Sequence, residues 1–361
     1  MENIIRPIAF YLPKFFPTKE NDLWWEPGFT EWTNVARAVP LFKGQYQPRI
    51  PRDLGFYDLR VPETREKQVM LAKEAGIEGF CYWHYWFGNG RRLLADVFHD
   101  VVISGKPDFP FCLCWANHSW LAKTWDPSKP PRMLMEQTYP GVDDYIAHFN
   151  EMLPAFMDER YIRVDGKLLF GLFAPLDMPE IDIFKDTWND LAKSHGLGGF
   201  KFFGYMPSPK NSSKVLEKFD YVTTDYYAEA ITSKDVFVKR CLKWINSHIL
   251  HRPYVGLYSD YVNYTINRIS DNKRELPCLL PNYDHTPRSG KRGLLLHKST
   301  PKLFAKLLMG SLRKRENISA DENLIFLKAW NEWGEGNYLE PDLKYGNGYL
   351  KAIKNVLDSI E

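Results

Sequence analysis

The chain has 361 residues, of which 44% are hydrophobic and 25% charged, so it can bury a large core as one α/β domain or two smaller ones. Its formal net charge is +2 and its Lys and Arg residues are scattered, which excludes the basic surface typical of nucleic-acid binding, and no apolar run approaches the roughly 18 residues of a membrane span. The aromatic content of 15% suits a protein that binds sugars, because aromatic rings are apolar on the face and polar at the edge.

The N-terminal stretch MENIIRPIAFYLPKFF lacks the basic segment, apolar stretch and cleavage site of a signal peptide. The five cysteines are an odd number, and Cys81, Cys112 and Cys114 lie in apolar runs, where thiols act as small hydrophobic side chains. No Cys or His pair completes a metal-ligand set. We therefore expect a reduced, cytoplasmic protein without a metal, while a leader that had been removed would leave the same pattern.

Apolar runs typical of strands alternate with helical segments along the chain. The runs are continuous rather than alternating, which indicates strands buried on both faces, as in a parallel sheet covered by helices. The predicted strands, in chain order, are PIAFYL (7–12), EGFCYWHYW (78–86), FPFCLCWA (109–116), LLFGLFA (168–174), FKFFGYM (200–206), YVTTDYY (221–227), LPCLLPN (276–282) and NLIFLKAW (323–330).

Two helices are marked most clearly by their spacing. Thr300 and Pro301 form a helix N-cap and first-turn pair, and an apolar stripe follows at Phe304, Leu308 and Leu312. Near the C-terminus, a second stripe has the i, i+3, i+4, i+7 spacing of an amphipathic helix. Its members are Ile353, Val356, Leu357 and Ile360.

Eight strands with interposed helices predict that residues 1–361 form a single (β/α)8 TIM barrel with long strand-to-helix loops. A doubly wound open sheet is the alternative fold. No G-x-G-x-x-G follows a strand and no G-x-x-x-x-G-K-[ST] occurs, so nothing marks a dinucleotide or phosphate site.

Barrel enzymes place their sites beyond the C-terminal ends of the strands, and these segments are rich in aromatic and polar residues here. The segment after the first strand, residues 13–60, is long enough to suggest a functional loop. The other notable segments are WHYWFGNGRR (83–92) after the second strand, WANHSWLAKTWD (115–126) after the third, NYDHTPR (282–288) after the seventh and WNEWGEGNYLEP (330–341) after the eighth.

The last of these segments contains the predicted catalytic residues, Glu332 and Glu335. Glu332 is expected at the end of the eighth strand and Glu335 one glycine-containing turn later, so both carboxylates can face one bound molecule. Apolar walls and mutual repulsion raise the pKa of one carboxyl, which stays protonated as an acid while the other ionises, as glycoside hydrolysis requires. The alternative is that these carboxylates cap a helix or pair with Lys344.

Aromatic and polar residues of the other loops are candidates for substrate contact, and each has a structural alternative. Those near Tyr82 could instead fill the barrel mouth, and Asp225, Asp284 and Arg288 could be salt-bridge anchors. The density of Trp24, Trp25 and Trp32 in a loop favours ligand contact. The predicted substrate-binding residues are Tyr11, Trp25, Glu31, Trp32, Tyr82, His84, Tyr85, Trp115, Asn117, His118, Trp120, Asp225, Tyr227, Asp284, Arg288, Trp330, Asn331, Trp333 and Glu340.

Four stretches carry a resemblance to a known family: residues 20–60, GIEGFCYWHYWFGNGRRLL (76–94), SGKPDFPFCLCWAN (104–117) and WNEWGEGNYLEP. They resemble the WbsX family, whose members are labelled glycosyltransferases and occur with polysaccharide biosynthesis functions in bacteria. That family is similar to the endo-α-mannosidase glycoside hydrolases, which are (β/α)8 barrels with an N-E-W-x-E-G pattern after the last strand. The resemblance spans most of the chain.

The hydrolase relatives imply retention of anomeric configuration through a 1,2-anhydro sugar. By this resemblance Glu332 would deprotonate the substrate 2-hydroxyl, Glu335 would protonate the leaving oxygen, and Glu340 would bind substrate or support the site. Manno- and rhamno-configured sugars suit this mechanism. The sequence departs from the family pattern at His118 and Ser119, and with Asn282 and Tyr283 in place of Gly-Trp, which implies altered sugar subsites and therefore a different glycan or reduced activity.

We therefore expect an endo-acting retaining glycoside hydrolase that acts on an oligo- or polysaccharide and uses no cofactor. Its pocket should be walled by Trp residues of the first, third and eighth loops. A glycosyltransferase is the main alternative, but the sequence contains no D-x-D pair and no phosphate cradle for a nucleotide-sugar donor. A carbohydrate-binding protein that has lost its chemistry is the third alternative, against which the intact Glu332 and Glu335 argue.

Overall fold

The computed structural model of the chain describes residues 5–122, 132–232 and 252–360. Its central feature is a closed ring of eight parallel strands, as the sequence predicts, rather than an open sheet. The strands pair in the order β3, β2, β1, β14, β11, β9, β8, β7, and β7 pairs with β3 to close the ring. They are β1 (Arg6–Tyr11), β2 (Gly79–His84), β3 (Phe111–Trp115), β7 (Lys167–Leu172), β8 (Phe200–Met206), β9 (Tyr221–Thr224), β11 (Glu275–Leu279) and β14 (Leu324–Leu327).

Each predicted strand overlaps one strand of the ring. Side chains on both faces of these strands are buried, and for this reason each strand appears in the sequence as a continuous apolar run. Inside the ring, large aromatic side chains fill the space, as expected for a packed barrel core. The Phe10 ring stacks on Trp83 at 4.6 Å between centroids and on Phe326 at 5.0 Å. These interior contacts join β1, β2 and β14 directly below the segment that carries Glu332.

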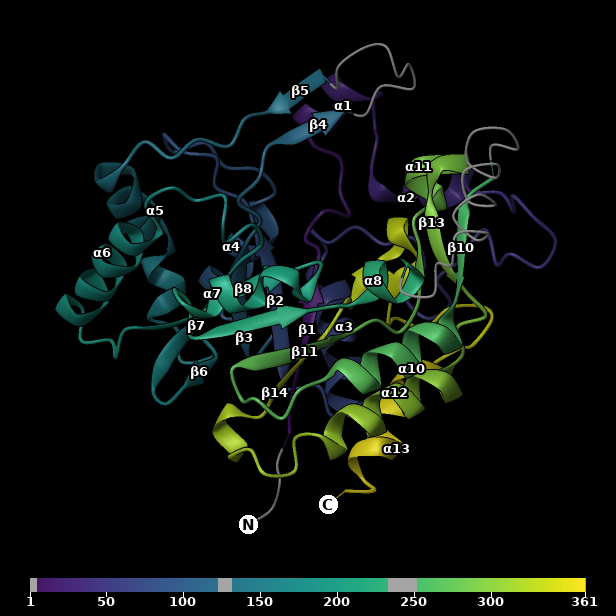
Figure 1. Cartoon of the computed structure of the whole chain (residues 1–361). Helices are drawn as coiled ribbons and strands as arrows, with labels where there is room; N and C mark the ends of the chain where they lie inside the picture. Colours follow the sequence, from purple (N-terminus) through teal and green to yellow (C-terminus); the bar gives the residue numbers. More distant parts are fainter. Residues whose placement is uncertain (1–4, 123–131, 233–251, 361) are drawn as a thin grey trace.

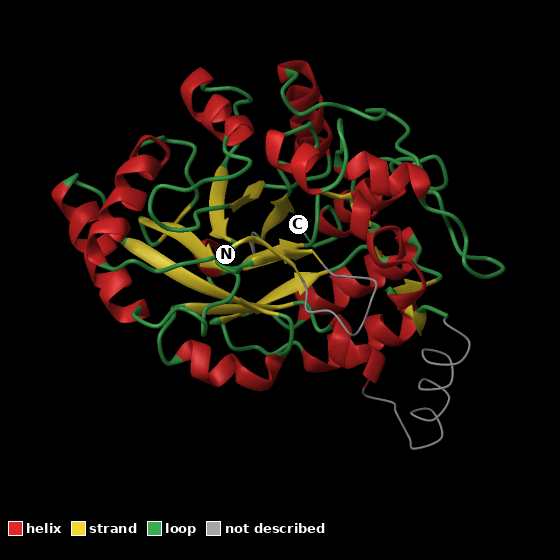
Figure 2. Ribbon diagram, turned by 90° about the horizontal axis from the view of Figure 1, so that it is seen from above, coloured by secondary structure: helices red, strands yellow, loops and turns green. Residues whose placement is uncertain are grey.

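Helices enclose the ring, as Figure 2 shows. The predicted helix start at Thr300 is confirmed, since the Thr300 hydroxyl accepts a hydrogen bond from the backbone N–H of Leu303 at 3.3 Å. The predicted C-terminal helix also forms, but it ends at Leu357, so Ile360 lies beyond it. The helices are α1 (Lys19–Trp24), α2 (Glu31–Arg37), α3 (Pro62–Glu74), α4 (Asp96–Ser104), α5 (Val142–Phe156), α6 (Ile181–Ser194), α7 (Ser212–Leu216), α8 (Tyr227–Thr232), α10 (Tyr258–Arg268), α11 (Thr286–Ser289), α12 (Pro301–Arg313) and α13 (Gly348–Leu357).

Short elements extend the loops at the C-terminal ends of the strands. Figure 1 shows α1, α2, α11 and the hairpin of β4 and β5 on one side of the barrel, with α12, α13 and both chain ends on the other. The short strands are β4 (Trp120–Ala122), β5 (Arg132–Met135), β6 (Arg163–Val164), β10 (Tyr254–Leu257), β12 (Tyr283–Asp284), β13 (Leu294–His297), β15 (Asn331–Glu332) and β16 (Asn337–Tyr338). The single-turn 3-10 helices are η1 (Pro209–Asn211), η2 (Gly290–Arg292), η3 (Ala320–Glu322) and η4 (Trp333–Glu335).

No helix within the described part of the chain combines the length and the apolar character needed to cross a lipid bilayer.

Candidate active site

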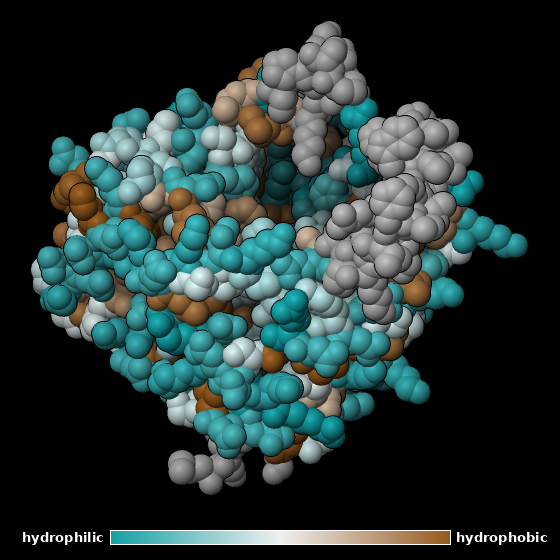
Figure 3. Space-filling model, viewed as in Figure 1, coloured by the Kyte–Doolittle hydropathy of each residue, from teal (hydrophilic) through white to brown (hydrophobic). Residues whose placement is uncertain are grey.

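A cleft opens at the C-terminal mouth of the barrel, and Glu332 and Glu335 lie in its inner chamber. The inner chamber has a volume of about 360 Å³ and continues into an outer groove of about 710 Å³. The two share Lys14, His118 and Trp120 in their walls. In Figure 3 the surface is hollowed near the top of the view, on the side of the barrel where α1 and α2 lie.

The end of β1 holds the segment that carries the two carboxylates. The Asn331 side chain accepts a hydrogen bond from the backbone N–H of Leu12 at 2.8 Å and donates one to the Leu12 carbonyl at 3.1 Å. The turn that follows needs glycine at position 334, because a Cβ atom there would collide with the Glu31 carboxylate and meet Arg288 Nε at 3.0 Å. The sequence N-E-W-G-E therefore places both carboxylates at the chamber against a neighbouring loop.

Glu332 is 5% exposed, and Trp83 Nε1 donates a hydrogen bond to its Oε1 at 2.8 Å. Burial raises the pKa of Glu332 to about 7, and the negative charge of nearby Glu335 acts in the same direction. The Trp83 hydrogen bond and the cations Lys328 and Arg288 oppose this rise without overcoming it.

Glu335 is surrounded by cations instead. Burial would raise its pKa, but the positive charges of Arg288, His285 and Lys328 and a hydrogen bond with Glu332 lower the pKa of Glu335 below its ordinary value. Arg288 Nη1 donates a hydrogen bond to Glu335 Oε1, and His285 Nε2 lies 3.8 Å from the same oxygen. Below about pH 7 the two carboxyls thus share one proton, which rests on Glu332 in the free protein.

Arg288 also ties the last loop to the first. Its Nε and Nη2 donate hydrogen bonds to Glu31 Oε2 at 3.1 and 2.9 Å, while Lys14 Nζ lies 3.0 Å from Glu31 Oε1. Burial would raise the pKa of Glu31, but Arg288 and Lys14 lower it to about 2. The Arg288 guanidinium is therefore fixed between two carboxylates from opposite ends of the sequence.

The floor of the chamber contains a buried cation, Lys328, just after β14. Its Nζ donates hydrogen bonds to Tyr205 Oη at 2.7 Å and to Asp225 Oδ2 at 3.3 Å. The Tyr205 hydroxyl donates to the same Asp225 oxygen. Burial would lower the pKa of Lys328, but Asp225, Glu332 and Glu335 raise it well above its ordinary value, so the side chain stays charged.

The walls of the cleft are aromatic. Trp83, Tyr85, Phe173, Tyr227 and Tyr283 line the inner chamber. Trp24, Trp25 and Trp120 line the outer groove, where the rings of Trp24 and Trp120 lie 5.9 Å apart. The expected contribution of the eighth loop is not part of this wall, because Trp330 and Trp333 are fully buried. Residues 123–126 of the third predicted segment lie outside the described residues.

Nine of the predicted site residues reach the cleft, namely the two predicted catalytic residues and seven residues of the walls. They are Trp25, Glu31, Tyr85, His118, Trp120, Tyr227, Arg288, Glu332 and Glu335. Sequence reasoning missed Lys14, Trp83, Phe173, Tyr205, His285 and Lys328, which line the same cleft. The sequence contained a signal for one of them, because Lys328 is a charged residue within the apolar run NLIFLKAW.

The remaining predicted residues are buried behind the walls and hold them in place. Glu340, for example, accepts hydrogen bonds from Gln68 at 2.6 Å, Trp333 at 2.5 Å and Tyr57 at 2.9 Å. Asp284 accepts two from Gln45 and Gln47 at 2.9 and 3.0 Å. The others in this position are Tyr11, Trp32, Tyr82, Trp115, Asn117, Asp225, Trp330, Asn331 and Trp333.

The residues at which the sequence departs from the family pattern differ in their placement. His118 and Tyr283 line the inner chamber, and Ser119 lines the outer groove. Asn282 is buried, and its side chain exchanges two hydrogen bonds with the backbone of Tyr338, at 3.1 and 3.2 Å. Three of the four departures therefore affect the surface of the cleft.

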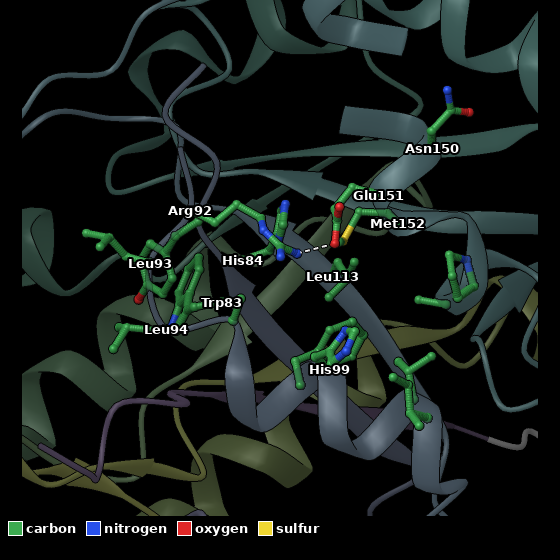
Figure 4. Close-up of a pocket in the computed structure, with 17 residues that line it drawn as sticks. Trp83, His84, Arg92, Leu93, Leu94, His99, Leu113, Asn150, Glu151 and Met152 are labelled. Carbon is green, nitrogen blue, oxygen red and sulfur yellow. Dashed lines mark hydrogen bonds and ion pairs between the residues drawn. The ribbon is translucent and has the colours of Figure 1, made fainter. Parts of the chain in front are cut away.

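His84 faces a different cavity, between β2, α4 and α5, which is shown in Figure 4. The Nε2 atoms of His84 and His148 lie 2.7 Å apart, and an ion pair joins Arg92 to Glu151 within the cavity lining. Most of the other lining residues are apolar, and Trp83 and Tyr85 lie between this cavity and the cleft. The structure thus separates His84 from Glu332 and Glu335.

Within residues 5–122, 132–232 and 252–360, no three His, Cys, Asp or Glu residues are grouped to hold a metal ion.

Comparison with protein families matches residues 7–353 to the family described as Glycosyltransferase WbsX. Two proteins named "Uncharacterized protein WxcX", from two strains of Xanthomonas campestris pv. campestris, are 35% and 33% identical over 373 residues. Each alignment covers 97% of this chain and 49% of the relative, so the chain spans about half the length of these curated relatives.

Solved structures share the fold. A "Glycoside hydrolase-like protein" matches with a TM-score of 0.63 and 14% identity over 98% of this chain and 94% of the other. The GH99 endo-alpha-mannosidase from Bacteroides thetaiotaomicron matches with a TM-score of 0.55 and 14% identity over 98% and 97% of the two chains. At this identity the likeness concerns the arrangement of the barrel.

Proposed function

The chain belongs to the WbsX family, and from this premise we propose that it is an endo-acting retaining glycoside hydrolase of bacterial oligo- or polysaccharides. The observation that carries the proposal is the pair of Glu332 and Glu335, two buried carboxyls that share one proton in an aromatic chamber. Acid–base hydrolysis of a glycosidic bond uses two carboxyl groups whose pKa values are shifted in opposite directions.

We assign the base role to Glu332 and the acid role to Glu335. Glu332 removes the proton of the substrate 2-hydroxyl, whose oxygen bonds to C1 while the bond from C1 to the leaving oxygen breaks. Glu335 gives its proton to that oxygen. Water then opens the resulting 1,2-anhydro sugar, so that the anomeric configuration is retained. This route favours manno- or rhamno-configured units, whose 2-hydroxyl can reach the back of C1.

The free protein holds the shared proton on the opposite carboxyl from the one that these roles require. The hydrogen bond between Glu332 and Glu335 offers a direct path for its transfer. Once the proton is on Glu335 and Glu332 is ionised, the pair is ready for the substrate hydroxyl. The cost of the exchange is set by the difference between the raised pKa of Glu332 and the lowered pKa of Glu335, and it does not depend on the pH.

The open groove supports cleavage within a chain rather than at its end. The outer groove extends the chamber along Trp24, Trp25 and Trp120, where sugar rings can stack. A polysaccharide can therefore lie across Glu332 and Glu335 with units on both sides of the scissile bond.

A glycosyltransferase is the second candidate, favoured by the description of the family. A diphosphate donor needs cations to bind its charge. The three Lys and Arg residues of the inner chamber are already paired, Lys14 and Arg288 with Glu31 and Lys328 with Asp225. A nucleotide sugar would have to compete with these carboxylates for the three cations, whereas a neutral glycan would not.

The deciding experiment offers the protein manno- and rhamno-containing bacterial polysaccharides in one series, and nucleotide sugars with oligosaccharide acceptors in another. Cleavage to shorter chains whose new reducing ends first appear with the substrate's configuration, followed by proton NMR, is the expected result. Extension of an acceptor without cleavage would replace the hydrolase with a transferase. Binding of a glycan without either reaction would favour a carbohydrate-binding protein.

A further inference from the structure

We propose that Lys328 is a further catalytic residue, which contacts the reacting sugar and stabilises the negative charge that develops on its 2-hydroxyl oxygen. The proposal rests on the hydrolase function proposed above. It adds a role for a side chain that lies on the floor of the chamber, four residues before Glu332 in the sequence.

The geometry leaves one donor of Lys328 for a ligand. An ammonium group has three N–H donors, and the described residues engage two of them through Tyr205 Oη at 2.7 Å and Asp225 Oδ2 at 3.3 Å. The residue is only 7% exposed and lines the same chamber as Glu332 and Glu335. A sugar hydroxyl bound between the two carboxyls can therefore accept the third hydrogen bond.

The position of the ammonium group is fixed before a ligand binds. Asp225 is fully buried and Tyr205 is 1% exposed, and the Tyr205 hydroxyl donates to the Asp225 oxygen that Lys328 also contacts. Each of the three residues comes from the end of a different strand, β8, β9 or β14. A cation held in this way need not reorganise during a reaction, which makes its effect on developing charge large.

A purely structural role explains the arrangement less well. A buried ion pair often adds little to stability, because removing both charges from water costs about as much as their attraction returns. Asp225 Oδ1 has no hydrogen-bond partner among the described residues, so the pair is not arranged for the largest stabilisation. The cation instead faces a chamber that contains two catalytic carboxyls.

The electrostatics of the chamber agree with this role. The groups that act on Lys328 are Asp225, Glu332, Glu335 and Tyr227, together with the hydroxyl of Tyr205 that it contacts. Of the two cations that lower the pKa of Glu332, Lys328 has a larger effect than Arg288. Lys328 therefore favours both the ionised form of the base and the charge that this base generates.

In the reaction, the O–H bond of the 2-hydroxyl breaks as its proton moves to Glu332. The freed electron pair of that oxygen forms the bond to C1, the bond from C1 to the leaving oxygen breaks, and Glu335 supplies the proton to the leaving oxygen. Lys328 donates a hydrogen bond to the 2-oxygen throughout and keeps its own proton.

The test compares Lys328→Met with Lys328→Arg and with Lys302→Met, a matched change at an exposed lysine of α12. Steady-state rates are measured on a polysaccharide that the wild type cleaves with retention. We expect Lys328→Met to lower kcat about 10²–10³-fold, as for loss of an oxyanion donor, with KM changed only a few-fold. Lys328→Arg should retain part of the rate and Lys302→Met all of it.

A second readout separates this role from a structural one. Because Lys328 lowers the pKa of Glu332, at which the catalytic pair loses its shared proton, Lys328→Met should move the alkaline limb of the pH profile of kcat/KM to higher pH. If Lys328→Met does not fold, the double variant Lys328→Met with Asp225→Asn removes both charges and is tested in its place. Wild-type kcat and an unmoved limb in a folded variant would overturn the proposal alone, whereas a wild type that cleaves no glycan would overturn the proposed function and this proposal together.

Discussion

The guanidinium of Arg288 donates two hydrogen bonds to the carboxylate of Glu31, at 3.1 and 2.9 Å, although 257 positions separate the two residues in the sequence. The same guanidinium contacts Glu335. The cleft is therefore assembled from loops that meet only in the folded barrel, and these loops supply the charges that set the pKa values of the proposed catalytic pair.

Replacement of either proposed catalytic carboxyl should strongly lower the rate of hydrolysis while leaving the glycan bound. We expect Glu332→Gln and Glu335→Gln each to lower kcat by at least 10²–10⁴-fold, since each change removes a proton-transfer group. Glu74→Gln, at an exposed position of α3, is the matched control. A substrate with an activated leaving group should partly rescue Glu335→Gln and not Glu332→Gln. Equal rates for wild type and both variants would show that the pair has another role.

The pH dependence of kcat/KM should show that the pair of Glu332 and Glu335 acts with one shared proton. The proposed reactive form, with Glu332 ionised and Glu335 protonated, is one arrangement of the singly protonated pair. The pair loses this proton near the pKa of Glu332, which burial and the charge of Glu335 raise to about 7. We therefore expect kcat/KM to fall about tenfold per pH unit above about pH 7. A profile that instead rises through pH 7 would mean that the reaction needs both carboxyls ionised, and would argue against Glu335 as the acid.

The ion pair of Glu31 with Arg288 and Lys14 should stabilise the fold at neutral pH. A pKa of about 2 in place of the ordinary Glu value of about 4.3 corresponds to about 3 kcal/mol of unfolding free energy. Because the pKa of Glu31 is lowered in the folded state, this contribution is present above about pH 4 and is lost as the pH falls towards 2.

Chemical denaturation of Glu31→Gln at pH 7 and at pH 3 measures this contribution. The loss of stability relative to wild type should be smaller at the lower pH. Glu26→Gln is the control in the same loop, since its ion pair with Arg37 is exposed and should contribute less than about 1 kcal/mol. A loss for Glu31→Gln that is independent of pH would argue against this electrostatic origin.

Trp25 should contribute to the binding of long glycans rather than to the chemistry. It lines the outer groove and is 48% exposed, so a sugar unit distant from Glu332 can stack on it. We expect Trp25→Ala to raise KM for long chains roughly 2–10-fold, the value of one aromatic contact, with kcat unchanged and short substrates unaffected. Leu23→Ala, at a more exposed residue of α1 outside the groove lining, should change neither constant. An equal effect on short and long substrates would place the reaction centre elsewhere.

The barrel was predictable from the sequence because its strands are buried on both faces and appear as continuous apolar runs. The position of Glu332 at the mouth followed from the end of the last run. The sequence did not predict which side chains of a strand face the chamber. On β2, Trp83 contacts Glu332, whereas its neighbours Tyr82 and His84 point away to Phe98 and His148. A run without polar alternation contains no signal for this choice.

The buried hydrogen bonds and ion pairs of the site could not be predicted from the sequence either. Lys328 could be noticed as a charge in an apolar run, but its partners Tyr205 and Asp225 are more than 100 positions away. Arg288 and Asp284 are close in sequence, yet one lines the cleft and the other is buried among Gln45 and Gln47. Contacts of this range are set by barrel closure, which no local pattern encodes.

The pairing of β14 with β1 and β11 closes the ring, and the proposed catalytic carboxylates follow β14 within eight residues. During synthesis on a ribosome, this segment emerges after the other seven strands of the ring. Until then β1 and β11 would each present an unpaired edge to other nascent chains, and the earlier loops would lack the carboxylates that Arg288 and Trp83 contact. A nascent chain thus gains protection from edge-to-edge association and the proposed catalytic carboxylates in the same step of its growth.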